Sequence, residues 1–140
     1  MQNAENLVAY RSARELAVAV YRLTAEFPDS ERFGLTAKMR RAAVSIGSNI
    51  AEGCGRQGSR ALVPFLHYAI GSGKELEFQL QLAALLGYAD GAELDAIRDR
   101  AAHTVRVLIR LSAAVRKRTI QLRVSSRPTS HGPRPTGQPR

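Results

Sequence analysis

Apolar residues recur along most of the chain at spacings of three and four, which is the period of an amphipathic α-helix. Four such segments predict helices over about residues 8–26, 34–55, 60–86 and 92–116. Phe27-Pro28-Asp29-Ser30 ends the first segment, because the residue before a proline is pushed out of the α region. Four long helices with short connections predict an all-α, up-down-up-down four-helix bundle.

Glycine, proline and capping residues set the expected boundaries. Gly53-Cys54-Gly55 predicts the end of the second helix, because glycine adopts the left-handed conformation that closes a helix. Ser59 is the expected N-cap of the third helix, and Pro64 moves the expected start of its regular part further along the chain. Asp90 and Glu93 have the spacing of a capping box for the fourth helix.

The second predicted helix has three different faces. Its apolar stripe consists of Leu35, Met39, Ala42, Ala43, Ile46 and Ile50. Its polar row consists of Lys38, Arg41, Ser45, Asn49, Glu52 and Arg56. Its third face has small, uncharged side chains, which let another helix approach closely: Ala37, Val44, Gly47 and Ala51.

The third predicted helix also has more apolar surface than one bundle core uses. The additional residues are Ile70, Phe78, Leu82 and Leu85. Together with the small face of the second helix, they predict the interface of a homo-oligomer. Gly71-Ser72-Gly73 in the same helix costs roughly 1 kcal/mol of helix propensity per glycine. Close packing of a neighbouring backbone explains these glycines, and the alternative is a weak point in the helix.

Composition agrees with close helix packing, because aromatic residues are few and Trp is absent. No apolar run approaches the 18 or so residues of a membrane span, and the N-terminus does not have the pattern of a signal peptide. The single cysteine, Cys54, forms no internal disulfide, which is typical of a reducing compartment. We therefore expect a cytoplasmic protein without a membrane partner.

The net charge of +9 is unevenly distributed. From Arg116 to the C-terminus there are seven basic residues and no acidic one, so the first 115 residues have a net charge of only +2. We expect a bundle over residues 1–118 and a basic, disordered tail over residues 119–140. A solvated tail and an RNA-binding arm are both compatible with this charge. The candidate nucleic-acid contacts are Lys38, Arg40, Arg41, Arg56, Arg60, Arg116, Lys117, Arg118 and Arg123.

The polar row of the second helix has two interpretations. In the first interpretation the row binds phosphates: its cations neutralise the phosphate charge, and Ser45 and Asn49 donate hydrogen bonds. Alternatively it links helices or subunits, and this interpretation is favoured because Glu52 repels a phosphate. The structural row then comprises Arg41, Ser45, Asn49, Glu52, Glu75 and Glu77, with Arg41 paired to one of the three glutamates. Arg40 and Arg56 are the preferred contacts outside the subunit.

No pattern for catalysis or cofactor binding is present in the sequence. A di-iron bundle needs Glu-x-x-His pairs, and the chain has none. Gly53, Gly55 and Gly58 have the spacing of a dinucleotide-binding motif, but no predicted strand precedes them. The nucleophile elbow of hydrolases does not occur in the sequence. We therefore expect a protein that is not an enzyme and that uses no metal, cofactor or small-molecule substrate.

Several motifs resemble those of one known family. They are Phe27-Pro28, Glu31-Arg32-Phe33-Gly34-Leu35-Thr36, Arg40-Arg41-Ala42-Ala43-Val44-Ser45-Ile46, Ser48-Asn49-Ile50-Ala51-Glu52-Gly53, Gly55-Arg56, Phe65-Leu66, Ala69, Gly71-Ser72, Glu75-Leu76-Glu77 and Leu86-Gly87-Tyr88. They are similar to the four-helix-bundle proteins encoded in intervening sequences of bacterial 23S ribosomal RNA genes, over roughly residues 7–115. Pro64 and Gly73 depart from the usual pattern of that family.

The resemblance implies a bundle that assembles into a ring, typically a pentamer, with RNA or a ribonucleoprotein as partner and without enzyme activity. A related role is that of the accessory variability determinants of diversity-generating retroelements, in which a basic bundle oligomer works with a reverse transcriptase. A protein-interaction scaffold that binds no nucleic acid is the alternative from a different class.

Overall fold

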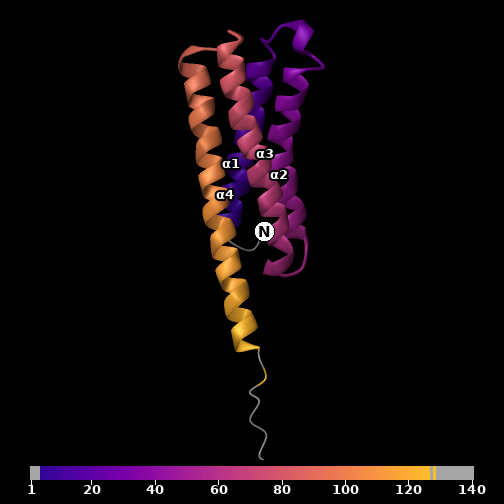
Figure 1. Cartoon of the computed structure of the whole chain (residues 1–140), viewed down its shortest axis with the longest axis vertical. Coiled ribbons are helices and arrows are strands. Elements are labelled where there is room, and N and C mark those ends of the chain that lie inside the picture. Colours follow the sequence, from indigo (N-terminus) through magenta and orange to yellow (C-terminus); the bar gives the residue numbers. More distant parts are fainter. Residues whose placement is uncertain (1–3, 127, 129–140) are drawn as a thin grey trace, which may run out of the picture.

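The computed structural model describes residues 4–126 and 128 of the chain. The elements are α1 (Ala4–Thr24), the short 3-10 helix η1 (Asp29–Glu31), α2 (Leu35–Gly55), α3 (Ser59–Leu85) and α4 (Gly91–Ser125). No strand occurs within this described part. The predicted all-α fold is confirmed, and Figure 1 shows the four long helices side by side along the long axis of the molecule.

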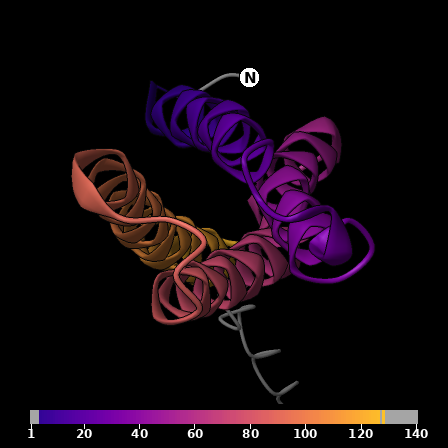
Figure 2. The same ribbon diagram turned by 90° about the horizontal axis from the view of Figure 1, so that it is seen from above.

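Each long helix packs against two others. Contacts join α1 to α2, α2 to α3, α3 to α4 and α4 to α1. Over the residues that the structure describes, no Cα atom of α1 lies within 8 Å of one in α3, and the same holds for α2 and α4. Seen from above, the four helices surround a common centre (Figure 2).

The apolar stripes predicted from the sequence fill this centre. The large side chains without exposed surface come from all four helices: Leu16, Val20, Met39, Ile46, Ile50, Leu66, Leu76, Leu80 and Leu108. Burial of each such side chain contributes about 1.5–3 kcal/mol. At one end of the core the rings of Phe27 and Tyr88 pack with their centroids 5.5 Å apart. Aliphatic residues therefore supply most of the core volume, as the low aromatic content predicted.

Hydroxyl groups join helices at two places. Ser12 of α1 and Thr104 of α4 are buried, and their hydroxyl oxygens are 2.6 Å apart. Thr104 donates its only hydroxyl proton to the carbonyl of Arg100, so Ser12 is the donor between the two helices. Ser45 of α2 and Ser72 of α3 form a second hydroxyl pair at 2.9 Å.

Glycine has a different role at the end of α2 from the one predicted. The helix ends at Gly55, within the predicted Gly53-Cys54-Gly55, but neither of these two glycines has the positive φ that the prediction gave them. Gly53 is buried, and a Cβ atom there would lie 2.7 Å from Leu62 Cδ1 and 2.8 Å from Phe65 Cβ. The glycine is therefore needed for close contact with α3, and the left-handed residue of this turn is Gly58, with φ of 86°.

The predicted start of α3 was also wrong in detail. The helix begins at Ser59, its N-cap is Gly58, and Pro64 lies inside the regular helix. Gly73 packs against α4, because a Cβ atom there would lie 2.6 Å from Val105 Cγ2, whereas a Cβ atom on Gly71 would meet nothing within 4 Å. The close neighbour of this segment is thus a side chain of α4, and only one of the two glycines is explained within the subunit.

The helix α4 differs from the prediction at both ends. Asp90 is its N-cap, but the aspartate side chain makes no capping hydrogen bond, so the predicted capping box is absent. The helix continues to Ser125 instead of ending near Arg116, and residues 119–125 of the expected tail are therefore helical. Arg, Lys, Gln and Leu favour helix without packing, which accounts for the extension. The rest of the expected disordered tail, apart from residues 126 and 128, lies outside the described residues.

Candidate assembly and nucleic-acid surfaces

The polar row of α2 divides into two parts in the structure. Asn49 Nδ2 donates to the carbonyl of Ser45 at 2.8 Å and to its hydroxyl at 3.1 Å, and Ser45 reaches Ser72 of α3. Glu52 and Arg56 form an exposed ion pair at 2.7 Å along α2. The middle of the row therefore links two helices, while its end is a surface pair of small energetic value.

The predicted pairing of Arg41 with a glutamate was wrong within the subunit. Arg41 is exposed and forms no ion pair with any described residue. Glu52 is taken by Arg56, and Glu75 accepts a hydrogen bond from Gln79 Nε2 at 3.2 Å. Glu77 lines a groove between α3 and α4, which is described below. Arg41 is therefore available for a contact outside the subunit.

Arg40 has an intramolecular role that the sequence reasoning missed. Its Nε donates to the buried hydroxyl of Thr24 at 2.8 Å, and one terminal nitrogen donates to the carbonyl of Tyr21 at 3.2 Å. Its guanidinium carbon lies 4.6 Å from the centre of the Tyr21 ring. Both partners lie in the last turn of α1, where a cation also interacts favourably with the helix dipole. The signal for this role was the position of Arg40 near the start of α2, just beyond the connection from α1.

The basic end of α4 is the most concentrated group of cations in the described chain. Arg116, Lys117, Arg118 and Arg123 are all exposed on its last three turns. Figure 1 shows this end of α4 projecting beyond the bundle, away from the other three helices. Exposed Ile120, Leu122 and Val124 lie among the cations. We refer to residues 116–125 as the α4 extension.

The predicted assembly residues lie mostly on the outer surfaces of α2 and α3. Val44, Phe78 and Leu85 are exposed to 44%, 62% and 80%, which is high for apolar side chains. Ala51 is exposed, Ala37 is partly exposed, and Ile70 and Leu82 are partly buried against the core. Gly47 faces α1 of its own subunit, because a Cβ atom there would lie 3.8 Å from Ala13 Cβ. Among the described residues, apolar side chains of α2 and α3 are thus exposed on the outer surface, and Gly47 is not one of them.

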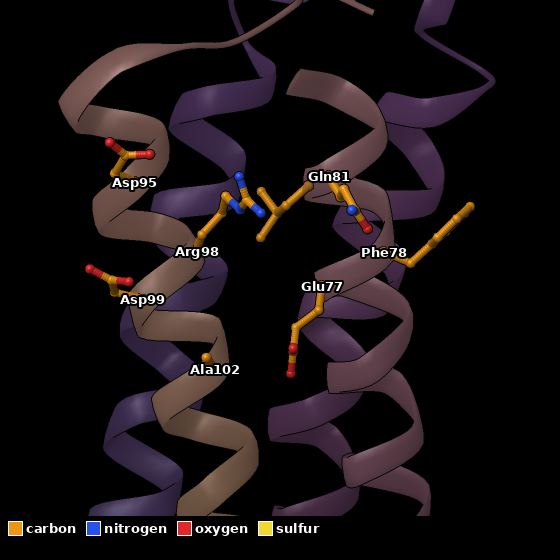
Figure 3. A pocket seen from close by; sticks show the side chains of 8 residues that line it. Glu77, Phe78, Gln81, Asp95, Arg98, Asp99 and Ala102 are labelled. Carbon is orange, nitrogen blue, oxygen red and sulfur yellow. The ribbon is translucent and has the colours of Figure 1, made fainter. Parts of the chain in front are cut away.

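An open groove of about 690 Å³ runs between α3 and α4 (Figure 3). Arg98 points across it towards α3, Glu77 points into it, and Phe78 points away to the outside. Asp95 and Asp99 add carboxylates on the α4 side. No group of three potential metal ligands occurs among the described residues. The groove is therefore lined by side chains of both charges.

Cys54 does not have the environment of a nucleophile. It is partly buried, and burial raises the pKa of its thiol above the ordinary value. A raised pKa favours the protonated thiol, whereas the thiolate is the reactive form. The residue packs beside the core and behaves as a small apolar side chain.

Comparisons with known proteins agree with this architecture. A family model described as 23S rRNA-intervening sequence protein matches residues 5–110. The chain is also similar to a crystal structure from Bacteroides thetaiotaomicron, described as a protein of unknown function from the S23 ribosomal protein family. That similarity has a TM-score of 0.71 and 22% identity, and it covers 78% of this chain and 98% of that chain.

No curated protein matches the chain. Within the part of the chain that the structure describes, none of the helices combines the length and hydropathy that a membrane span requires. The structural similarity shows the fold. On this fold, apolar side chains of α2 and α3 and the cations at the end of α4 are exposed.

Proposed function

The chain belongs to the family of 23S rRNA-intervening sequence proteins, and on that premise we propose that it is a non-enzymatic homo-oligomer that binds RNA or a ribonucleoprotein in the cytoplasm. We assign the subunit an up-down-up-down topology, which the short connections between consecutive helices and the contact of each helix with the next support. The oligomer is ring-like and typically a pentamer, as the family resemblance implies.

The single observation that carries the RNA part of the proposal is the α4 extension. Its four cations lie on a helix without any acidic residue between Arg116 and Ser125. Phosphate binding by Lys and Arg releases counterions, which supplies most of the affinity in sequence-independent binding. Cations on a projecting helix reach a phosphate backbone without distortion of the bundle. A ring oligomer multiplies this contact by presenting several such helix ends to one RNA.

The cations of α2 are weaker candidates than the sequence suggested. Arg40 is held against α1, and Arg56 pairs with Glu52 while its guanidinium carbon lies 5.6 Å from the centre of the Phe65 ring. Binding of a phosphate by either residue first breaks these contacts. Lys38, Arg41 and Arg60 remain exposed and are a useful comparison for the α4 extension.

The test is a salt titration of RNA binding by the full-length protein with two matched triple variants. One variant replaces Arg116, Lys117 and Arg123 by Gln, and the other replaces Lys38, Arg60 and Lys74 by Gln. Both remove three exposed positive charges. For single-stranded RNA, loss of three phosphate contacts lowers the slope of log K against log salt by about 2.

We expect the lower slope and weaker binding only in the α4 variant. Equal losses in the two variants contradict a specific role of the α4 extension and indicate a general charge effect. Absence of RNA binding by the unchanged oligomer at low salt refutes the RNA proposal and favours the protein-interaction scaffold.

A further inference from the structure

We propose that a single-stranded segment of RNA lies along the outer side of α4, with its phosphates on a row of cations and its bases on a parallel row of apolar side chains. This inference rests on the proposed RNA binding and deepens it in two ways. It extends the binding surface from the α4 extension along the bundle to Arg110 and Arg106, and it names unpaired RNA as the ligand.

The outer side of α4 is uncovered and basic. The helix packs against α1 and α3, and Figure 2 shows no described helix outside it. Arg106, Arg110 and Lys117 follow one another at spacings of four and seven residues, so they lie on one side of the helix. All three are exposed. We call these three residues the cation row, which is about 16 Å long at 1.5 Å of rise per residue.

No carboxylate neutralises the cation row within the described part of the subunit. Neither Arg106 nor Arg110 forms an ion pair with a described residue, although the two lie one turn apart on the helix. Like charges at this spacing destabilise a helix. The chain has no acidic residue after Asp99, so the rest of α4 offers no neutralising partner. A phosphate backbone supplies negative charge along its whole length and removes this repulsion.

The cation row ends at the seam between α1 and α4. Seven residues before Arg106, the same side of α4 carries Asp99, which lines an open groove of about 440 Å³ at this seam. Glu15 of α1 lines the same groove and pairs with Arg100 at 2.7 Å. Carboxylates repel a phosphate backbone, so the RNA-binding surface begins after Asp99 and continues towards the α4 extension.

A row of exposed apolar side chains lies beside the cation row. Ile109, Ala113, Ile120 and Val124 follow one another at spacings of four, seven and four residues, so they share a second side of α4. All four are exposed, and the exposed fractions of Ile120 and Val124 are 62% and 68%. We call these four residues the apolar row. Large aliphatic side chains exposed to this degree gain from a partner that removes them from water.

The two rows are neighbours along the whole surface. Each of three apolar residues follows a cation by three positions: Ile109 after Arg106, Ala113 after Arg110, and Ile120 after Lys117. Residues three apart are adjacent on the surface of a helix. The outer side of α4 therefore has a positively charged edge and an apolar edge that run in parallel.

Single-stranded RNA has the two matching edges. Its phosphates lie along one edge, and its unpaired bases can turn their faces towards the apolar row. A regular RNA duplex stacks its bases against one another and presents phosphates and sugars on the outside, and side chains cannot enter its deep, narrow major groove. A duplex neutralises the cation row but leaves the apolar row in water, so both rows together favour the single strand.

The first experiment compares single-stranded and double-stranded RNA by fluorescence anisotropy with the full-length protein. The probes are a labelled RNA of about 12 nucleotides and the same strand paired with its complement. Charge alone favours the duplex, because neutralising each of its phosphates releases more counterion. We expect the single strand to bind about fivefold more tightly or better, because only its bases cover the apolar row.

The second experiment removes two cations that lie outside the α4 extension. The variant combines Arg106→Gln with Arg110→Gln, and the matched control combines Arg22→Gln with Lys74→Gln, which also removes two exposed cations. Loss of two phosphate contacts lowers the slope of log K against log salt by about 1.4 for a single strand, which weakens binding about tenfold near physiological salt. We expect this loss in the α4 variant only.

The third experiment makes part of the apolar row polar without a change of charge. Ile120→Gln with Val124→Gln is compared with Leu7→Gln and Val18→Gln, which are exposed apolar positions of α1. We expect about fivefold weaker binding of the single strand by the α4 variant, with an unchanged salt slope and unchanged affinity for the duplex. An unchanged helical circular dichroism spectrum confirms that each variant is folded.

The outcomes separate this inference from the proposed function. If the unchanged protein binds neither RNA at low salt, the proposed RNA binding and the inference both fall. If it binds RNA but the Arg106 and Arg110 variant behaves like its control, the extended surface is wrong and the α4 extension remains the candidate. Equal or tighter binding of the duplex, or unchanged single-strand affinity after substitution of Ile120 and Val124, overturns the assignment of unpaired RNA.

Discussion

Replacement of Arg40 by alanine tests whether this residue stabilises the subunit or contacts a partner. In the structure it joins the start of α2 to the last turn of α1 through Thr24 and Tyr21. Arg40→Ala removes both hydrogen bonds, and it also removes the contact of the guanidinium with the Tyr21 ring. Thr24 keeps its own donated bond to the carbonyl of Val20, so no buried donor is left unpaired.

The expected loss can be estimated from these contacts. A hydrogen bond from a charged donor contributes about 1.5–3 kcal/mol when well formed, and the bond to Tyr21 at 3.2 Å is the weaker of the two. Stacking on an exposed aromatic ring adds about 0.5–1 kcal/mol. Partial exposure of Arg40 reduces both contributions through solvent screening. We therefore expect Arg40→Ala to lower the free energy of unfolding by about 2 kcal/mol.

Urea unfolding followed by circular dichroism measures this loss, at one fixed protein concentration because assembly contributes to stability. Lys38→Ala is the matched control, since Lys38 is exposed on the same helix, and it is expected to change stability by less than about 0.5 kcal/mol. Equal stability of the two variants refutes the stabilising role of Arg40. Loss of RNA affinity with unchanged stability favours the original interpretation of Arg40 as an outside contact.

Three further predictions concern the helix contacts and the thiol. Gly73→Ala is expected to destabilise by about 1–3 kcal/mol despite its better helix propensity, because the new Cβ meets Val105; increased stability in urea unfolding contradicts this. Ser12→Ala is expected to cost about 1 kcal/mol through loss of the bond to Thr104, and an unchanged thermal midpoint argues against that bond. Cys54 is expected to react with iodoacetamide more slowly than free cysteine at about pH 8, because its pKa is raised; equal rates contradict its burial.

The sequence predicted the helices and the core because burial repeats with the helical period. Leu35, Met39, Ile46 and Ile50 were assigned to one stripe from spacing alone, and all four are buried. Spacing does not determine which residues meet across two helices. The partners of Arg40, the contact of Gly53 with α3 and the hydroxyl pair of Ser12 therefore appeared only in the structure.

The end of α4 was missed for a different reason. Beyond Thr119 the apolar residues Ile120, Leu122 and Val124 do not form one stripe, and the prediction took the loss of pattern for the loss of helix. Helix propensity does not require a buried face, and the extension follows from the residues themselves. Its cations therefore have a defined position on a helix, which strengthens their candidacy as phosphate contacts.

Sedimentation velocity of the full-length protein with labelled single-stranded RNA at low and moderate salt is the most direct test of an RNA-binding oligomer. The account predicts a protein mass several times the 15.3 kDa of one chain, with RNA that sediments with the protein and dissociates as salt increases. A stable monomer of 15.3 kDa, or RNA that remains free of the oligomer at low salt, contradicts it.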